Sequence, residues 1–454
     1  MTSLRRGLHR VQVTGLLGTY DYDLELSAEA QRAGVSILYG ENGTGKTTLL
    51  NLLFHVLSAA VAEGHRTATS RIRFKRLYVE TASGDHITAE KTDPKATTFS
   101  QEVSLARGGT CRVDSLPEEH RNEAFSDKYT RMCELLRRAS VSPKLLSHRR
   151  ILSDDSRVAS AVQRTVQTSP FQLTWPLVRT SLEDRAAPDP DDAVLNDMLE
   201  SATRALAREA AQLRDSGMLM ADRLYASLIE RLALQPEEDP ATLAEITGGL
   251  AKLAERSRTF SAFGLSPRVR LEETLVQLAA LSPHSGHATV VAAMLKPYIA
   301  DLTARFDALE SLSATLTKVT STLDNMLLNK TLTFSIEDGF SITQRRSGEP
   351  IPPTALSSGE RQLLLLTCTA LSSRTSKTLL LIDEPELSLN ILWQRALIPL
   401  LQTCMGEDTS TVVATHSMEV LSQYRDTLLR LPRQSESIGE AAGSRDSARG
   451  GGRA

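Results

Sequence analysis

One segment of this chain sets its architecture: GENGTGKT, which runs from Gly40 to Thr47. It follows Val35–Tyr39, a short apolar run typical of a buried strand, and it precedes Thr47–Val61, where leucines and alanines recur at helical spacing. The segment fits the pattern G-x-x-x-x-G-K-[ST], and a strand before it and a helix after it are the context that supports such a match. Its glycines let successive backbone N–H groups point into one concave loop at the positive end of a helix. The segment therefore predicts a phosphate-binding loop.

The overall composition limits what such a loop could serve. A chain of 454 residues has room for two or three domains. Lys plus Arg total 52 against 55 for Asp plus Glu, so the net charge of -3 gives no global positive field to draw in DNA or anionic lipid. Aromatic residues make up only 4%, which argues against an RNA platform built on base stacking. Four scattered cysteines, no secretion signal and no long apolar run predict a cytoplasmic protein without disulfides or membrane spans.

A second motif with a chemical role is TLLLIDEP, from Thr378 to Pro385. Its apolar residues predict a buried strand whose C-terminal end delivers Asp383 to the crevice where open parallel sheets bind ligands. We expect Asp383 and Thr47 to hold Mg²⁺, and Glu384 to orient the attacking water or accept its proton. Lys46 should reach the β and γ phosphates of ATP. The residues expected to bind the nucleotide are Gly40, Asn42, Gly43, Thr44, Gly45, Lys46, Thr47 and Thr48.

The segment upstream of this strand, LSSGERQ from Leu356 to Gln362, resembles the signature motif of ATP-binding-cassette (ABC) ATPases. Its LSSGE spelling resembles the OLD (overcoming lysogenization defect), RecF and SMC branch more than the transporters. Ser388-Leu389-Asn390 stands where that family has its D-loop, and Ala414–Ser417, spelled ATHS, resembles its switch-histidine segment. The likeness covers roughly residues 8 to 95 and 330 to 425, which leaves the middle of the chain without an assigned motif.

The resemblance implies how two copies of the chain would share one site. Ser357 and Gly359, with Ser358 and Glu360 in the same motif, would cap the γ phosphate of ATP held by a second protomer. Ser388 and Asn390 would form the D-loop. His416 would contact the γ phosphate within its own protomer and act with Glu384 and Lys46 in catalysis. The implied cofactors are ATP and Mg²⁺, and the implied assembly is a homodimer or higher homo-oligomer whose heads sandwich ATP.

The expected fold is α/β: a P-loop NTPase head of the ABC type, with a mainly parallel sheet split by a long helical insertion. The expected parts are residues 1–117 for the first half of the head, 118–329 for the insertion, 330–433 for the second half and 434–454 for a disordered tail. An apolar stripe from Leu295 to Met326 predicts one long helix, as part of a helical subdomain or of a projecting coiled-coil arm. A second stripe, Leu195 to Leu213, is a candidate for its antiparallel neighbour.

Several residues leave alternatives open. Gln101 and Gln172 are candidates for the family's Q-loop glutamine, and each is also typical of an ordinary surface residue. Tyr20 or Tyr22 could face adenine or serve packing. Arg71, Arg73 and Lys75 alternate along an expected strand, Arg71–Glu80, and could touch a phosphodiester backbone or simply be solvated.

These observations predict an ATPase, converting ATP and water to ADP and phosphate, whose head dimerisation controls a partner effector. Few residues follow His416, so we expect no C-terminal TOPRIM domain and a separate effector, an HNH or TOPRIM nuclease, as in bacterial anti-phage systems of the Septu or PARIS kind. One alternative is a RecF-like DNA-repair ATPase that acts on DNA. Another is a nucleotide-gated scaffold with little turnover. The long insertion disfavours a transporter subunit, so no membrane partner is expected.

Overall fold

The computed structural model describes residues 7–60, 64–114, 123–139, 141–147, 152–154, 194–215, 243–266, 271–279 and 286–431. The chain divides into two compact units. Unit 1 comprises Met1–Pro170, Asp189–Leu195 and Ser357–Ala454, and unit 2 comprises Phe171–Pro188 and Asn196–Leu356. The expected Gln172 and the expected tail at 434–454 lie outside the described residues.

A six-stranded sheet forms the centre of unit 1, in the order β14-β3-β13-β12-β8-β9. Every neighbouring pair is parallel except β8 and β9. All six residues of β12 are buried, as expected for a parallel strand covered on both faces. The α/β fold with a mainly parallel sheet is thereby confirmed. The strands are β3 (Val35–Tyr39), β8 (Ser142–Leu146), β9 (Leu152–Asp154), β12 (Thr378–Asp383), β13 (Ser410–Thr415) and β14 (Leu428–Arg430).

A second, antiparallel sheet of unit 1 has the order β2-β1-β4-β5-β6-β7. Its strands bury alternate residues, so one face joins the core and the other meets solvent. The sequence did not predict β6 and β7, and the strand expected from Arg71 begins only at Arg76 because a helix ends at Arg71. The strands are β1 (Leu8–Leu16), β2 (Tyr20–Glu25), β4 (Arg76–Thr81), β5 (His86–Glu90), β6 (Ser100–Ser104) and β7 (Thr110–Asp114).

Helix α2 (Lys46–Leu57) is largely enclosed: eight of its twelve residues are buried, and the other four are half-buried. Its leucines belong to one hydrophobic cluster that also contains residues of both sheets. Full burial of a leucine side chain stabilises the folded state by about 1.5–3 kcal/mol, so this helix is held firmly where it emerges from the phosphate loop. The other helices of unit 1 are α1 (Ala28–Ala33), α3 (His65–Arg71), α4 (Glu123–Arg138), α10 (Ser358–Ser372), α11 (Ile391–Cys404), α12 (Met418–Leu421) and the 3₁₀ turn η3 (Arg425–Thr427).

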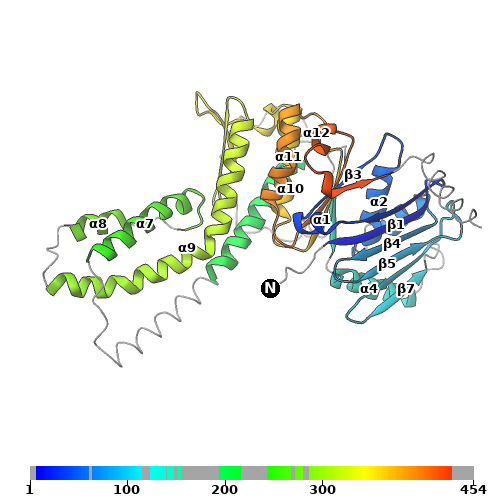
Figure 1. The fold of residues 1–454 in the computed structure, drawn as a ribbon, viewed down its shortest axis with the longest axis horizontal. Helices are drawn as coiled ribbons and strands as arrows, with labels where there is room; N and C mark the ends of the chain where they lie inside the picture. The colour runs from blue at the N-terminus through cyan, green and yellow to red at the C-terminus, as the bar shows by residue number, and fades with distance from the viewer. Residues whose placement is uncertain are drawn as a thin grey trace, which may run out of the picture. The chain divides into compact units, whose positions relative to one another are not determined.

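Unit 2 is mainly helical and includes α9 (Gly286–Met326), a single helix of 41 residues that covers the expected apolar stripe. Helix α7 (Leu243–Ala262) packs along α9, with the rings of Phe260 and Phe306 4.8 Å apart. Figure 1 shows α7 and α8 (Leu271–Ala279) beside α9. The unit also contains β10 (Lys330–Ser335), β11 (Gly339–Gln344), the 3₁₀ turn η2 (Pro353–Ala355) and most of a helix over residues 194–215.

Helix α7 is a described neighbour of α9. The helix that carries the second stripe reaches the end of α7, where Arg214 donates to the Leu265 carbonyl at 2.8 Å. Its antiparallel pairing with α9 stays a prediction. The structural units divide at other points than residues 117 and 330. Strand β8 pairs with β12 in the head although it lies inside the expected insertion, and the hairpin β10–β11 belongs to unit 2.

Two further features bear on the sequence expectations. Among the described residues, no helix combines the length and apolar character needed to cross a membrane. All four cysteines are free thiols in buried positions. Burial raises the pKa of the Cys404 thiol to about 12, so this thiol stays protonated and packs as a small apolar group.

Candidate functional site

The site lies at the carboxyl edge of the parallel sheet, where β3, β13 and β12 end side by side. Tyr39 at the end of β3 pairs with Thr415, and Asp383 at the end of β12 pairs with Ala414. The phosphate loop follows β3, and His416 follows β13. The strand register therefore brings together three segments that are far apart in the sequence, at the edge where such sheets bind ligands.

The phosphate loop is a tight turn that leads directly into α2. Gly45 caps the helix with φ at +83°, a left-handed conformation that other residues adopt only with strain. Thr44 donates its hydroxyl to the Glu41 carbonyl at 2.8 Å, which closes the turn. Asn42 and Gly43 are exposed at its tip, whereas Thr48 is half-buried in the first turn of α2.

Lys46 carries the positive charge of this loop, and it is buried. Its Nζ donates to the carbonyl of Gly40 at 2.6 Å and to that of Glu41 at 3.0 Å. The ammonium group therefore lies across the loop, beside the helix N-terminus whose free N–H groups favour anions. Phosphate oxygens are the acceptors that fit this combination of a cation and inward N–H groups.

Thr47 and Asp383 meet directly. The Thr47 hydroxyl lies 2.9 Å from Oδ2 and 3.1 Å from Oδ1 of Asp383, whose side chain is buried. A hydroxyl and a carboxylate side by side supply the oxygen ligands that Mg²⁺ prefers, and Mg²⁺ usually takes its remaining ligands from phosphate and water. These two residues therefore fit a magnesium ion bound together with a nucleotide.

Glu384 and His416 lie next to each other beyond the strand ends. Glu384 has φ at +49°, a costly conformation for a residue with a side chain, and its N–H donates to the Ala414 carbonyl at 2.8 Å. Its Oε1 lies 3.6 Å from Nδ1 of His416. Backbone strain of this kind, of order 1–3 kcal/mol, persists where the surrounding structure enforces it, and such positions cluster at active sites.

Tyr22 forms a hydrogen bond to the backbone of the phosphate loop. Its hydroxyl donates to the Thr44 carbonyl at 2.8 Å in a buried position. Burial, with a smaller effect of Tyr20, raises the pKa of Tyr22 to about 12, so the hydroxyl keeps its proton at neutral pH. Tyr20 stacks on Tyr22 with ring centroids 5.8 Å apart. Of the two alternatives left open for Tyr22, the structure favours packing.

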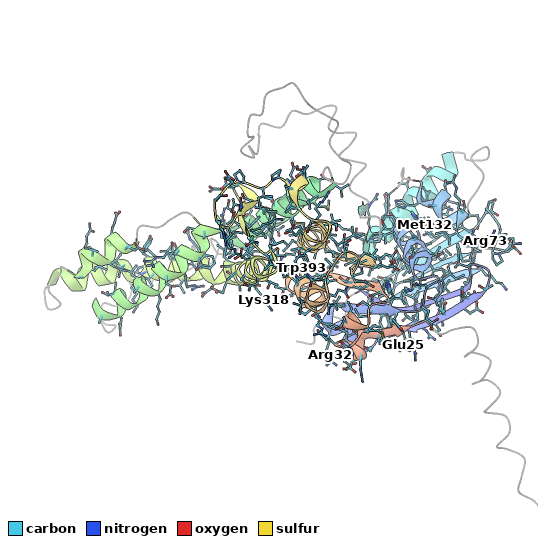
Figure 2. The ribbon with its side chains drawn as sticks, turned by 90° about the horizontal axis from the view of Figure 1, so that it is seen from above. Glu25, Arg32, Arg73, Met132, Lys318 and Trp393 are labelled. Atoms are coloured by element: carbon cyan, nitrogen blue, oxygen red, sulfur yellow. The ribbon has the colours of Figure 1, made fainter. Side chains whose placement is uncertain are left out.

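Two other sets of residues considered in the sequence analysis lie outside this site. Gln101 is buried in β6 and donates its amide to the Val56 carbonyl at 2.8 Å, near the end of α2 and about 15 Å along the helix from Lys46. It therefore packs the core instead of serving as a Q-loop. Arg71 ends α3, and Arg73 and Lys75 precede β4, so the three do not alternate along a strand; Arg73 is labelled in Figure 2.

The signature motif begins helix α10. Ser357 caps the helix: its hydroxyl accepts from the Glu360 N–H at 3.3 Å, and the Glu360 carboxyl accepts from the Ser357 N–H at 2.7 Å. This reciprocal pair is a capping box, which satisfies two N–H groups at the helix start. Glu360 thus has a structural task within the motif. Ser357 and Ser358 are exposed, whereas Gly359 and Glu360 are buried.

The D-loop packs against the signature motif within the same protomer. A Cβ on Gly359 would lie 2.6 Å from the Ser388 carbonyl oxygen and 3.4 Å from the ring of Trp393, which Figure 2 labels. Ser388 has φ at +68°, and Asn390 caps α11 by accepting from the Trp393 N–H at 3.0 Å. Gly359 is therefore required here because the D-loop backbone leaves no room for a side chain.

The structure thus places the predicted residues in two groups. One is the nucleotide edge, formed by the phosphate loop, Asp383, Glu384 and His416. The other is the signature face, formed by Ser357–Gly359 and the D-loop residues Ser388 and Asn390. Their roles in binding and catalysis stay predictions. Sequence reasoning missed two residues that form hydrogen bonds with the His416–Ser417 segment: Glu386 and Gln394. The one available signal was the position of Glu386, three residues after Asp383.

Part of the chain is similar to a known protein family. A family model described as "AAA domain, putative AbiEii toxin, Type IV TA system" matches residues 242–422, less than half of the chain. The match includes Asp383, Glu384 and His416 but not the phosphate loop. No curated protein matches the chain.

Three solved structures resemble the chain at low identity. The Smc head domain of Pyrococcus furiosus, with an extended coiled coil and bound to the C-terminal domain of ScpA, has 10% identity and a TM-score of 0.35, over 96% of this chain and 98% of that one. An SmcHead bound to the C-winged helix domain of ScpA has 8% identity and a TM-score of 0.34, over 95% and 99%. The recombination mediator protein RecF-ATPrS of the RecFOR pathway has 12% identity and a TM-score of 0.30, over 95% and 99%.

The fold and the family match lead to one conclusion about the class of this protein. A phosphate loop between β3 and α2, and a carboxylate at the end of β12 in the same parallel sheet, form the arrangement of a P-loop NTPase. Residues 242–422 are similar to a family described as an AAA domain.

Proposed function

We propose that this chain binds and hydrolyses ATP at a site completed by a second copy of itself. The observation that carries the proposal is the direct contact between the Thr47 hydroxyl and the Asp383 carboxylate, 2.9 Å apart. This contact joins the phosphate loop to the strand-end carboxylate in the arrangement that phosphoryl transfer needs. The proposed reaction converts ATP and water to ADP and phosphate.

In this proposal, different residues of one protomer bind the phosphates, bind magnesium and activate the attacking water. Lys46 and the N–H groups at the start of α2 hold the phosphates, and Thr47 and Asp383 hold magnesium. The bound ion supplies positive charge that offsets the charge building up on the phosphate oxygens. Glu384 orients the attacking water and takes its proton, and His416 contacts the γ phosphate.

In the proposed dimer, the signature face of one copy contacts the ATP held by the other copy. Ser357 and Ser358 are exposed at the N-terminus of α10, where hydroxyls and free N–H groups favour an anion such as the γ phosphate. Large apolar side chains are exposed on the D-loop and the starts of α11 and α12: Leu387, Ile391, Leu392 and Met418. Exposed apolar residues of this size mark interaction surfaces when they gather. We propose that another head covers them when ATP is bound.

A mixing experiment tests whether the site is composite. Lys46→Ala and Ser357→Arg should each abolish hydrolysis when pure. In a heterodimer, the Ser357→Arg chain still offers an intact phosphate loop and the Lys46→Ala chain an intact signature, so one of the two sites is complete. Mixing equal amounts should restore about a quarter of the wild-type rate, because half of random dimers are mixed and each has one complete site. Hydrolysis that stays absent on mixing, or a Ser357→Arg protein that is active alone, contradicts the composite site.

The Ser357→Arg substitution also removes a helix cap, which costs about 1 kcal/mol. Ser358→Arg separates the two effects, because Ser358 is exposed and takes no part in the capping box. It should block hydrolysis as strongly as Ser357→Arg. Ser347→Arg, at an exposed serine in the turn after β11, is the matched control and should leave the rate unchanged.

We further propose that ATP-driven head closure controls a separate effector, a nuclease of the HNH or TOPRIM class, in anti-phage defence. The support is the OLD-like spelling of Ser357–Glu360 and Thr415–Ser417, together with a matched family described as a putative AbiEii toxin of a Type IV TA system. Co-purification of a nuclease from the natural locus, with phage resistance lost in a Lys46→Ala strain, is expected. Unchanged phage sensitivity with and without the locus contradicts this role.

A RecF-like action on DNA remains a second candidate because Arg71, Arg73 and Lys75 are all exposed near the start of β4. Such a cluster suits phosphate contacts. If DNA is the regulator, duplex DNA should accelerate hydrolysis, and raising the salt concentration should reduce that acceleration. A triple Arg71→Ala, Arg73→Ala, Lys75→Ala variant should lose the acceleration and keep the basal rate.

A further inference from the structure

Glu386 is a buried acidic residue to which none of the motifs described above gives a role. It lies in the loop between β12 and α11, three residues after Asp383, and its side chain is only 5% exposed. Buried acids are rare unless their oxygens are bonded, so the partners of this side chain indicate its task.

One carboxyl oxygen of Glu386 holds the segment that carries the switch histidine. Its Oε1 accepts the hydroxyl hydrogen of Thr415 at 2.5 Å and the backbone N–H of His416 at 3.0 Å. These two bonds fix the chain at the end of β13, immediately where it leaves the sheet. The backbone position of His416 therefore depends on Glu386.

The same oxygen also faces the histidine ring. Nδ1 of His416 lies 3.3 Å from Oε1 of Glu386 and 3.6 Å from Oε1 of Glu384. Two acceptor oxygens beside one ring nitrogen favour a hydrogen on that nitrogen, because a lone pair there would face other lone pairs. The hydrogen at Nδ1 leaves Nε2 as the ring nitrogen that can face a ligand, and the side chain of His416 is 46% exposed.

The second oxygen of Glu386 has no hydrogen-bond partner among the described residues. An unpartnered buried oxygen costs about 1–3 kcal/mol, so an acid is a poor choice if packing alone were needed. The presence of a glutamate here is thus better explained by the two hydrogen bonds that Oε1 accepts from Thr415 and His416 than by a contribution of the side chain to stability.

A chain of hydrogen bonds continues from this segment to the D-loop. The Ser417 N–H donates to the Thr415 hydroxyl at 3.0 Å, and the Ser417 hydroxyl donates to Oε1 of Gln394 at 2.8 Å. The amide of Gln394 in turn donates to the Leu389 carbonyl at 2.9 Å. The histidine segment and the D-loop are therefore tied together within one protomer.

We infer that Glu386 is a positioning residue for His416: its Oε1 keeps the hydrogen on Nδ1 and directs Nε2 toward the γ phosphate. The inference rests on the proposed ATPase function for its consequence, but the placement of the ring hydrogen can be measured without hydrolysis. The bonded chain through Gln394 places this oxygen next to the D-loop, where a second head would arrive.

Steady-state kinetics with two substitutions test the role. Glu386→Ala removes the acceptor and should lower kcat about 10- to 100-fold, as loss of an orienting partner commonly does, while KM for ATP changes less than about threefold. Glu386→Gln keeps an acceptor oxygen for the Thr415 hydroxyl and the His416 N–H and beside Nδ1 of His416. It also places its NH₂ where Oε2 had no partner, so it should keep kcat within about threefold of wild type. Thr415→Val removes one donor but leaves both contacts to His416, and it should also stay within about threefold. Equal kcat values for Glu386→Ala and wild type, or an equal loss in Glu386→Gln, overturn the inference.

Nitrogen-15 NMR of the histidine rings gives the readout that is independent of turnover. The His416 signals are assigned by their loss in His416→Gln, and wild type and Glu386→Gln should show hydrogen on Nδ1. Glu386→Ala should shift the population toward hydrogen on Nε2, with thermal unfolding measured beside it. If wild type shows no hydrolysis while the NMR pattern holds, the proposed function fails and the positioning role stands. If wild type hydrolyses ATP but its Nδ1 bears no hydrogen, the positioning role fails alone.

Discussion

The nucleotide edge and the signature face of unit 1 are built in opposite ways. At the nucleotide edge, the side chains of Lys46, Asp383 and Glu386 are buried. The Lys46 ammonium bonds carbonyls of its own loop, whereas the carboxylates of Asp383 and Glu386 accept hydrogen bonds from segments far away in the sequence. At the signature face, Ser357 and Ser358 are exposed, and Leu392 is 73% exposed on the adjoining helix. The functional groups of the first region are enclosed within one copy, whereas the second region presents exposed serine and apolar side chains at its surface. The difference supports the proposal that one chain binds ATP and that two chains are needed to hydrolyse it.

The capping box sharpens this contrast. Glu360 and the Ser357 backbone are occupied by each other, so the helix start is held in shape before any partner arrives. Gly359 likewise leaves space that the Ser388 carbonyl fills. The signature face is therefore preformed and rigid, as a surface must be if it is to place an N-terminus against a phosphate without further ordering cost.

The largest effect is expected at the nucleotide edge from Glu384→Gln. Removing a general base typically costs about 100- to 10,000-fold in rate, so kcat should fall by that amount. ATP affinity should stay within about threefold of wild type, because Glu384 does not form part of the phosphate loop. Phosphate release and equilibrium binding measure the two quantities. Glu337→Gln, at an exposed turn in unit 2, is the control, and unchanged turnover in Glu384→Gln would remove the assigned role.

The next largest effect concerns the affinity for ATP, which Lys46→Ala should lower in addition to abolishing hydrolysis. Lys46→Ala removes the cation that lies across the phosphate loop, and a hydrogen bond to a charged group contributes about 1.5–3 kcal/mol. ATP affinity should therefore fall about 10- to 100-fold, measured by calorimetry. Lys318→Ala, an exposed lysine on α9 labelled in Figure 2, should bind ATP normally. Equal losses in both variants would show that the loop cation is not what holds the phosphates.

A third substitution should affect dimerisation through the signature face without affecting ATP binding at the nucleotide edge. Leu392→Asp should weaken ATP-dependent dimerisation about 10-fold or more, because truncating or charging a buried interface anchor costs at least about 1–2 kcal/mol. Thermal stability and ATP affinity of the single chain should not change, since Leu392 is already 73% exposed. Val276→Asp on α8 is a close control because Val276 is also 73% exposed. Sedimentation of both variants in a Glu384→Gln background with ATP distinguishes a specific interface from a general effect of adding charge.

The same contrast explains what could be predicted from the sequence. The phosphate loop and Asp383 were identified because strand, turn and helix signals are local and the spacing of their residues is set by backbone chemistry. The signature motif was identified by resemblance, but its exposure was not, because exposure depends on which segments pack nearby. The capping function of Glu360 follows the local pattern of a serine followed three residues later by a glutamate.

The elements that were missed depend on distant partners. Ser142–Leu146 lies among helical signals, and only pairing with β12 makes it a strand of the head. Arg71 was placed in a strand because Arg71, Arg73 and Lys75 alternate there, yet α3 continues to Arg71 and the strand begins only at Arg76. For Glu386 the sequence offers only its position three residues after Asp383, since its hydrogen bonds come from Thr415 and His416 at the end of β13, much later in the chain.

The smallest expected effect tests whether one hydrogen bond from β2 helps to hold the phosphate loop in the shape that binds ATP. Tyr22→Phe keeps the ring that stacks on Tyr20 and removes only the hydroxyl that bonds the Thr44 carbonyl. A neutral hydrogen bond contributes about 0.5–1.5 kcal/mol, so ATP affinity should fall about 2- to 10-fold without loss of kcat at saturation. Tyr78→Phe is the matched control, because its hydroxyl bonds His86 on the antiparallel sheet instead of the loop. If both variants bind ATP like wild type, the loop needs no support from β2, and its shape is set by the glycines and α2 alone. If only Tyr22→Phe weakens binding, the hairpin of β1 and β2 is part of the nucleotide edge although it contributes no residue to the motif.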